Sequence, residues 1–300
     1  MNLRAAVLTG ITLLAFAANS LLCRMALASD LIGPVVFSAI RLGSGVAILV
    51  PLSALMTEPK HEACLSGSWK SGLALFVYAM AFSLAYVSLE TGVGALILFG
   101  SVQATMIGAA LRQGERPRPQ EWFGLVMAMA GLVYLVLPGM RAPNPLGAVL
   151  MLASGVGWGV YSLRGKASSA PVAATAGNFA RAFALAIALL IVGLFMSWNV
   201  QRASVRGAAL AVISGALSSG LGYVIWYIAL RDLTATRAAI VQLAVPVIAA
   251  AAGIIVLGEE PSVRLAIASL MILGGVGGAI LARNHGAALD PCENSPERRP

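Results

Sequence analysis

The stretch AVLTGITLLAFAANSLLCR, residues 6–24, specifies the architecture, because the second half of the chain repeats it as AVLMLASGVGWGVYSLRGK, residues 148–166. The alignment places Phe16 on Trp158 and Ser20 on Ser162, 142 positions apart. Further matches follow at nearly the same spacing along both halves, including Arg41 with Arg181. Self-similarity over such a length indicates that one structural unit occurs twice.

Each half contains five long apolar segments of about the length that crosses a bilayer. They cover residues 3–23, 34–56, 71–89, 93–111 and 122–138, then 145–164, 173–197, 207–229, 237–257 and 264–282. Because five is odd, the second half starts on the opposite side of the membrane from the first. The sequence therefore predicts an all-α membrane protein with ten transmembrane helices, arranged as two inverted five-helix repeats around a central cavity. The first repeat is residues 1–140, the second is 141–283, and a polar, disordered tail is 284–300.

The composition excludes a water-soluble domain. Hydrophobic residues make up 59% of the 300 and charged residues only 11%, whereas soluble domains have about a quarter of their residues charged. The three cysteines lie far apart without CxxC spacing, so neither a disulfide framework nor a zinc site is indicated. We expect no metal, no cofactor and no nucleic-acid partner. The expected partners are a small-molecule substrate and the lipid bilayer.

The charge distribution predicts the orientation in the membrane. With the N-terminus in the cytoplasm, thirteen lysines and arginines fall on the inner side and five on the outer side. Both termini are then cytoplasmic, which we expect in a multi-pass protein of the bacterial inner membrane. The apolar stretch 5–22 resembles a signal peptide, but it exceeds the usual length of such a region, so we expect it to be retained.

All twelve acidic residues lie at span ends, in loops or in the tail. Proton- or sodium-driven carriers usually place a carboxylate at membrane depth, where its cost marks a functional role. Their absence there favours a facilitator or exchanger over a carboxylate-coupled pump. Glu90, at the tip between the third and fourth spans, is the nearest candidate for coupling.

Arg41 and Arg181 are the charged residues well inside the spans. Each lies near a helix end, where a long arginine reaches the headgroups or the exposed carbonyls of a neighbouring helix. We favour this structural interpretation. The alternative is a positive charge that pairs with a substrate carboxylate.

Polar and aromatic residues recur at helical spacing on one face of several spans, which predicts a neutral, hydrogen-bonding pocket. The predicted substrate-binding residues are Asn19, Ser20, Tyr78, Phe82, Gln103, Trp158, Tyr161, Tyr223, Trp226 and Gln242. The alternative is that these side chains only pack together or anchor the spans at the membrane interface.

Three residues are candidate hinges or gates. Pro246 removes a helix hydrogen bond midway along the ninth span, and Gly94 and Gly100 lie in the fourth. Small residues also permit close helix packing, which is the simpler explanation for most glycines. We expect a monomer, although Gly274-x-x-x-Gly278 also fits a homodimer interface.

Two five-helix halves, Pro34-Val35 followed by Arg41, and Leu257-Gly258-Glu259 after Pro246 resemble the drug/metabolite transporter superfamily. The last-span Gly274 is similar to that of its ten-helix EamA-type exporters. Within that group, residues 13–24 and 32–35 look most like the YddG-type amino acid exporters. The resemblance implies a basket of helices around a substrate cavity. Two departures concern the substrate: Asn19 and its neighbours replace a tryptophan-glycine pair, and the fourth span lacks a proline.

The combined prediction is an exporter of aromatic and other neutral amino acids, working by alternating access and without catalytic residues. Hairpins formed by spans three and four and by spans eight and nine would act as gates. Export of drugs or other metabolites is the alternative. A channel or a membrane-embedded lipid enzyme is more remote, since no buried acid or Ser/His pair is present to serve catalysis.

Overall fold

The computed structural model describes residues 3–56, 65–112, 119–137, 143–165, 168–196, 203–231, 233, 238, 241–242 and 244–288. The described helices are α1 (Leu3–Ala28), α2 (Pro34–Met56), α3 (Trp69–Tyr86), α4 (Thr91–Arg112), α5 (Pro119–Val136), α6 (Pro145–Gly165), α7 (Pro171–Phe195), α8 (Val205–Ile213), η1 (Ser214–Leu221), α9 (Gly222–Arg231), α11 (Ala244–Ala252), η2 (Gly253–Leu257) and α12 (Val263–Ala288).

These helices coincide with the predicted apolar segments. The eighth segment is made of α8, η1 and α9 in succession, and the ninth is described from Ala244 onward as α11 and η2. Within the described residues, six helical segments are long and apolar enough to span a membrane, and shorter apolar helices accompany them. The prediction of an all-α, membrane-spanning fold is confirmed.

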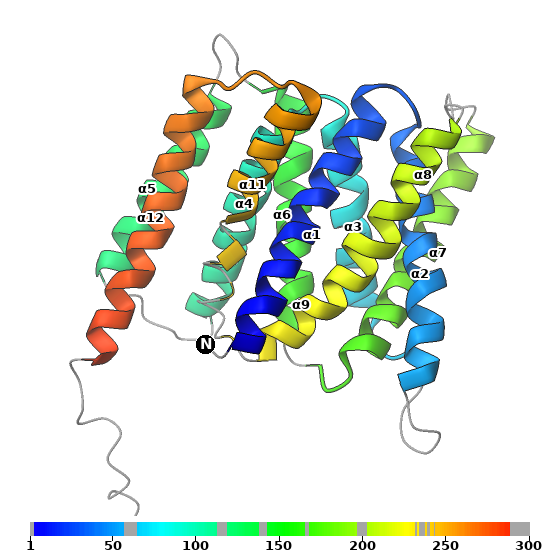
Figure 1. Cartoon of the computed structure of the whole chain (residues 1–300), viewed down its shortest axis with the longest axis horizontal. Helices are drawn as coiled ribbons and strands as arrows, with labels where there is room; N and C mark the ends of the chain where they lie inside the picture. The colour runs from blue at the N-terminus through cyan, green and yellow to red at the C-terminus, as the bar shows by residue number, and fades with distance from the viewer. Residues whose placement is uncertain are drawn as a thin grey trace, which may run out of the picture.

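The helix packing is symmetric when the two halves are exchanged: a contact made by a helix of one half recurs for its counterpart in the other half. We call this exchange symmetry. Helices α2 and α7 pack together, as do α4 and α11, and α5 and α12 form one edge of the bundle in Figure 1. Each of these pairs joins a helix to its repeat counterpart. Helix α3 packs on α6, and in the equivalent contact α9 packs on α1. The start of α1 and the end of α12 lie at the same end of the bundle (Figure 1).

Helix starts follow local chemistry. Proline is the first residue of α2, α5, α6 and α7, a position where its missing N–H costs nothing. The Ser68 hydroxyl accepts a hydrogen bond from the Ser71 amide at the start of α3, and Ser204 does the same for Gly207 at the start of α8. Such caps satisfy amides that have no partner within the helix.

The eighth segment departs from α-helical geometry between Ser214 and Leu221, where the π-helix η1 has a wider turn. We did not predict this irregularity. Its sequence, SGALSSGL, consists mainly of small residues, which lets α2 cross it closely. A Cβ atom added to Gly215 would lie 2.0 Å from the Arg41 carbonyl oxygen, so only glycine permits this approach.

The C-terminal boundary differs from the prediction. Helix α12 continues to Ala288, beyond residue 283, where the sequence placed the start of a disordered tail. Residues 284–288 extend the helix because nothing in Asn284-His285-Gly286-Ala287-Ala288 prevents its hydrogen bonds from continuing. The remainder of the predicted tail, and the predicted repeat boundary near residue 140, lie outside the described residues.

Candidate functional site

Aromatic side chains from both halves meet at the centre of the bundle. Phe16 of α1 and Trp158 of α6, which the repeat aligns with each other, lie edge to face with ring centroids 5.2 Å apart. Trp158 also lies 5.0 Å from the ring of Tyr78 on α3 and 4.6 Å from that of Tyr223 on α9. Such pairs contribute about 0.5–1.5 kcal/mol each beyond the burial of their area. They join the two halves through side chains.

A small cavity adjoins these rings. Its lining is Phe16 and Ser20 of α1, Tyr78 and Phe82 of α3, Leu98 and Phe99 of α4, and Trp158 of α6. Four of the predicted binding residues belong to it, namely Ser20, Tyr78, Phe82 and Trp158. The walls are mostly aromatic, with a few hydroxyl groups, and they come from both halves of the chain.

Arg41 of α2 lies beside this cavity, with 1% of its surface exposed. Its Nε donates a hydrogen bond to Ser219 Oγ at 2.9 Å, and its Nη2 donates to the hydroxyls of Tyr78 and Tyr223 at 3.1 and 2.8 Å. The guanidinium carbon lies 5.1 Å from the ring centroid of Phe82. Nη1 has no hydrogen-bond partner among the residues that the structure describes.

Asn19 extends this network to α1. Its Nδ2 donates to the Tyr78 hydroxyl at 3.3 Å, and its Oδ1 accepts from Ser214 Oγ at 2.6 Å and from Ser219 Oγ at 3.4 Å. The hydroxyl of Tyr223 donates to that of Tyr78 at 2.9 Å. The structure thus brings Asn19, Tyr78 and Tyr223 together around the guanidinium, as part of one network.

Gln242 supports Trp158 from behind the cavity. The indole Nε1 donates to Gln242 Oε1 at 3.1 Å, while Gln242 Nε2 donates to the Ala238 carbonyl at 3.1 Å. Both side chains are buried. Gln242 therefore contacts the predicted site through Trp158, and it orients the ring that lines the cavity.

The remaining predicted residues lie around this centre, outside the cavity lining. Tyr161 stacks on Tyr227 with ring centroids 5.4 Å apart, and Trp226 lies 5.7 Å from Phe16. Gln103 is buried on α4, one helical turn after Phe99. The structure therefore groups the predicted residues into a cavity wall, a polar network and a supporting layer.

The three candidate hinge residues are all buried. A Cβ atom on Gly94 would lie 2.5 Å from a ring carbon of Tyr86, so the start of α4 packs tightly against α3. Pro246 lies in α11, and the π-helix η2 follows it from Gly253. Gly100 lies in the middle of α4. A hinge role for Pro246, Gly94 and Gly100 stays a prediction.

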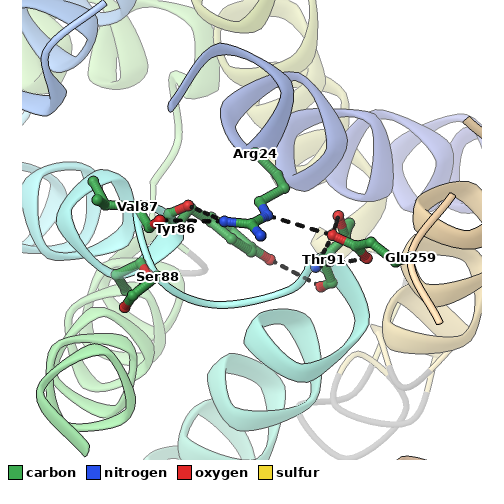
Figure 2. Close-up of polar contacts among 7 residues, drawn as sticks. Arg24, Tyr86, Val87, Ser88, Thr91 and Glu259 are labelled. Atoms are coloured by element: carbon green, nitrogen blue, oxygen red, sulfur yellow. Dashed lines mark hydrogen bonds and ion pairs between the residues drawn. The ribbon is translucent and has the colours of Figure 1, made fainter. Parts of the chain in front are cut away.

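A polar cluster closes the end of the bundle where α1 ends and α4 begins (Figure 2). Glu259 accepts hydrogen bonds from the amide and the hydroxyl of Thr91 at 2.9 Å, and Arg24 Nε lies 3.4 Å from Glu259 Oε1. Arg24 Nη1 donates to the carbonyls of Tyr86 and Val87 at 3.1 and 3.3 Å. We call Arg24, Thr91 and Glu259, with these carbonyls, the Arg24–Glu259 cluster.

Gly258 positions Glu259 in this cluster. It ends η2 in the left-handed conformation with φ 66°, and its amide donates to the Ile254 carbonyl. Glycine adopts this conformation without the steric penalty of a Cβ atom. The reversal turns the Glu259 carboxylate towards the N-terminus of α4, where free amides and the helix dipole stabilise an anion.

Arginines also hold the opposite end of the bundle. Arg164 of α6 donates to the hydroxyls of Ser71 and Ser68 at 2.9 and 3.1 Å, at the start of α3. Arg181 of α7 donates to the carbonyls of Ser66 and Gly177 at 2.9 and 2.8 Å. These bonds tie the start of α3 to the second half of the chain.

Several residues at the centre are not among the predicted binding residues, although helical spacing places Phe16 and Ser219 on the predicted polar faces. Phe16 and Phe99 line the cavity, and Ser214 and Ser219 complete the network around Asn19 and Arg41. For Phe16 a signal existed, since the repeat aligns it with Trp158. For Ser219 the signal was its helical spacing to Tyr223, whereas Ser214 lies at the start of the π-helix η1 and had no such signal.

Comparison with known proteins agrees with these features. Residues 145–281 match the family model described as the EamA-like transporter family. The chain is 49% identical over 286 residues to the uncharacterized protein PA1977 of Pseudomonas aeruginosa, covering 95% of this chain and 97% of that one. It is 28% identical to the uncharacterized transporter YwfM of Bacillus subtilis, over 83% of this chain and 85% of that one.

Of two further matches, one covers about a third of the chain and the other shows the fold alone. The uncharacterized inner membrane transporter YedA of Escherichia coli is 31% identical over 107 residues, covering 36% of this chain and 32% of that one. A crystal structure superposes with a TM-score of 0.65 and 20% identity over 95% of this chain and 99% of its own, which shows the shared fold. The chain is a multi-pass membrane transporter, and residues 145–281 in its second half match the EamA-like transporter family.

Proposed function

We propose that this transporter exports amino acids, the aromatic and other neutral ones, from the bacterial cytoplasm across the inner membrane. The observation that carries the proposal is the cavity between Phe16, Tyr78, Phe82 and Trp158, with the polar network of Asn19 and Arg41 beside it. Aromatic walls suit an apolar side chain, and hydrogen-bonding groups suit the α-amino and carboxylate groups of an amino acid.

Alternating access is the mechanism that we propose for the two related halves. The Arg24–Glu259 cluster closes one end of the bundle, and the Arg164 and Arg181 contacts close the other. Opening one set of contacts while the other stays closed would expose the central cavity to one side at a time. The helical hairpin of α3 and α4 takes part at both ends, which supports its role as a gate.

The positions of the acidic residues fit facilitated transport or exchange. Among those described, Glu259 belongs to the cluster at the bundle end and Glu90 is exposed. A carboxylate at the centre of the bundle, which proton coupling commonly uses, is not found in the described part of the chain. We therefore expect transport that does not require a proton gradient.

Counterflow in proteoliposomes tests this function. The purified protein is reconstituted with an unlabelled amino acid inside, and uptake of the labelled form is measured for each of the twenty amino acids, with and without an imposed pH gradient. We expect saturable uptake of neutral and aromatic amino acids both with and without the imposed pH gradient. Absence of counterflow for all of them, together with ethidium resistance in expressing cells, would replace the amino acid proposal with drug export.

A further inference from the structure

We propose that Arg41 is a specificity-determining residue that binds the carboxylate of the transported molecule through its Nη1 atom. The inference rests on the proposed function for the choice of amino acids as substrates. It reverses the structural interpretation of Arg41 that its position in the sequence favoured. Three features of Arg41 support it: its charge, its unused donors and its place beside the cavity.

The first feature is the positive charge of Arg41. Arginine does not lose its proton in proteins, so the buried guanidinium is a fixed positive charge inside the membrane protein. The groups that receive its hydrogen bonds, Ser219, Tyr78 and Tyr223, are neutral hydroxyls. The salt bridge found in the described residues joins Arg24 to Glu259 and leaves Arg41 without an acidic partner there. A buried charge is costly unless an opposite charge or strong hydrogen bonds compensate it.

The second feature is the set of N–H donors of the Arg41 guanidinium. Nε and Nη2 are used by Ser219 and the two tyrosines, which lock the orientation of the guanidinium plane. Nη1 carries two N–H donors and has no partner among the described residues. Buried donors in native proteins are nearly always satisfied, so an unsatisfied one requires an explanation. A carboxylate oxygen is the acceptor that a guanidinium binds best.

The third feature is the location of Arg41 relative to the cavity. Tyr78 and Phe82 line the cavity, and their ring centroids also lie 5.2 and 5.1 Å from the Arg41 guanidinium carbon. These two rings therefore separate the guanidinium from the cavity, which in this structure has room for about one water molecule. For a substrate to bind, the cavity would widen and the rings of Tyr78 and Phe82 would part, so that the substrate carboxylate reaches Nη1 while its side chain lies among the rings of Phe16 and Trp158.

Arg181, the repeat counterpart, provides an internal contrast. Its Nη1 donates to the carbonyls of Ser66 and Gly177, and its guanidinium carbon lies 6.0 Å from the Trp69 ring. These two backbone carbonyl oxygens, one in the loop before α3 and one within α7, accept hydrogen bonds from Nη1 and partly offset the charge. The sequence favoured a structural role for both arginines, in contact with headgroups or carbonyls. This role fits Arg181. The corresponding position in the first half has no such carbonyls around its Nη1 in the described structure.

Ligand-induced thermal stabilisation of the purified full-length protein in detergent tests the proposal, because a ligand that binds the folded state raises the unfolding temperature. Two probe sets separate the chemical groups: phenylalanine, 3-phenylpropionate and phenethylamine, and leucine, isocaproate and isoamylamine. Within each set the carboxylate or the amine is absent in turn. The variants are Arg41→Gln, Arg41→Lys and the control Arg206→Gln, which removes the charge of an exposed arginine on α8.

We expect probes with a carboxylate to stabilise the wild type and the amines to have no effect. Arg41→Gln should weaken carboxylate binding by about 10- to 100-fold, the loss expected for a charge-assisted hydrogen bond. Arg41→Lys should retain part of the binding, since it keeps the charge but not the planar donors. Arg206→Gln should bind as the wild type does. Should Arg41→Gln not fold, Arg41→Lys and Tyr223→Phe, which releases one contact of the guanidinium, still provide the comparison.

The outcomes for Arg41 and for the proposed function are separable. Stabilisation by 3-phenylpropionate or isocaproate that Arg41→Gln abolishes, without counterflow of any amino acid, supports the carboxylate site and contradicts amino acid export. Equal stabilisation by amines and carboxylates, or carboxylate binding that Arg41→Gln leaves unchanged, overturns the role of Arg41 even where amino acid counterflow is present. A wild type that no carboxylate probe stabilises overturns it as well.

Discussion

Arg41 and Trp158 illustrate how single side chains acquire different roles from similar sequence signals. Both lie in apolar runs, and both are buried at the junction of the two halves. The indole N–H of Trp158 is satisfied by Gln242, whereas one nitrogen of Arg41 is not satisfied in the described structure. A satisfied buried group stabilises a packed centre, whereas an unsatisfied one calls for an explanation, and for Arg41 the explanation that we propose is a ligand.

The Trp158–Gln242 hydrogen bond gives a prediction at the residue scale. Trp158→Phe should lower the stability by about 1–3 kcal/mol, because the buried Gln242 Oε1 loses its donor. It should also raise the KM for counterflow, since the ring lines the cavity. Thermal unfolding in detergent and counterflow kinetics measure the two effects.

The double variant Trp158→Phe with Gln242→Met is the control, because it removes the acceptor together with the donor. We expect it to be more stable than Trp158→Phe alone, since no buried oxygen is left without its partner. Equal losses for the single and the double variant would show that the volume of the indole, and not its hydrogen bond, accounts for the stability.

The irregular parts of the helices have the largest influence on the geometry at the scale of elements. The π-helix η1 turns Ser214 and Ser219 towards α1 and α2, and η2 ends in the reversal at Gly258 that places Glu259 on α4. Both irregularities lie in the second half of the chain. They explain why two halves with related sequences present different side chains to the centre.

The crossing of α2 over η1 predicts a strong effect of a small substitution. Gly215→Ala adds a Cβ atom that would lie 2.0 Å from the Arg41 carbonyl oxygen, so the two helices must separate. Overpacking of this kind costs about 1–3 kcal/mol. Thermal unfolding should show the loss, and Gly10→Ala, whose Cβ atom meets nothing within 4 Å, should show none. Equal behaviour of the two variants would mean that the crossing is not close in solution.

The Arg24–Glu259 cluster predicts control of access to the centre. Glu259→Gln removes the charge that binds Arg24 and the N-terminus of α4, so this end should open more often. Cys23 is a native reporter, because it is buried next to Arg24 and its Sγ lies 3.9 Å from Ser83 Oγ. With the two other cysteines replaced by serine, we expect faster labelling of Cys23 by a maleimide in Glu259→Gln.

Glu260→Gln is the matched control for this experiment, since it removes an exposed carboxylate adjacent in the sequence. Its labelling rate should equal that of the parent protein. The idea that the cluster holds this end closed fails if Cys23 reacts at the same rate in Glu259→Gln as in Glu260→Gln.

The whole molecule combines exchange symmetry in its helix contacts with asymmetry in its central side chains. Helices pack with their repeat counterparts at the edges, as α5 does with α12 (Figure 1). At the centre, Phe16 faces Trp158, and Arg41 has no equivalent there because Arg181 binds backbone carbonyls. A symmetric scaffold allows alternating access, while an asymmetric centre allows a substrate to bind in one orientation.

The charge bias leads to a topology prediction for the whole molecule. In a variant without native cysteines, Ser88→Cys and Glu260→Cys should react with a membrane-impermeant maleimide on intact cells. Lys70→Cys and Ser169→Cys should react only after the membrane is opened. All four residues are exposed in the structure, so burial does not confound the comparison. The reverse labelling pattern would place both termini outside the cytoplasm.

The helices and their repeat were predictable from the sequence because the bilayer imposes local rules. A span must be apolar over about 20 residues and must satisfy its own backbone hydrogen bonds, so each segment can be recognised by itself. The faces that carry Asn19, Ser20, Tyr78 and Trp158 followed from helical periodicity for the same reason. These properties depend on neighbours along the chain.

The environment of each buried polar group depends on the tertiary structure. Arg41 meets Ser219 and Tyr223, and Arg24 meets Glu259, across separations of 178, 182 and 235 residues. Periodicity indicates which face of a helix is polar, but not which distant side chain will satisfy it. The repeat gave Arg41 and Arg181 equivalent positions, and the packing of η1 against α2 gave them different partners. This difference arises because a buried charge is governed by the groups within a few ångströms of it, and long-range contacts place those groups.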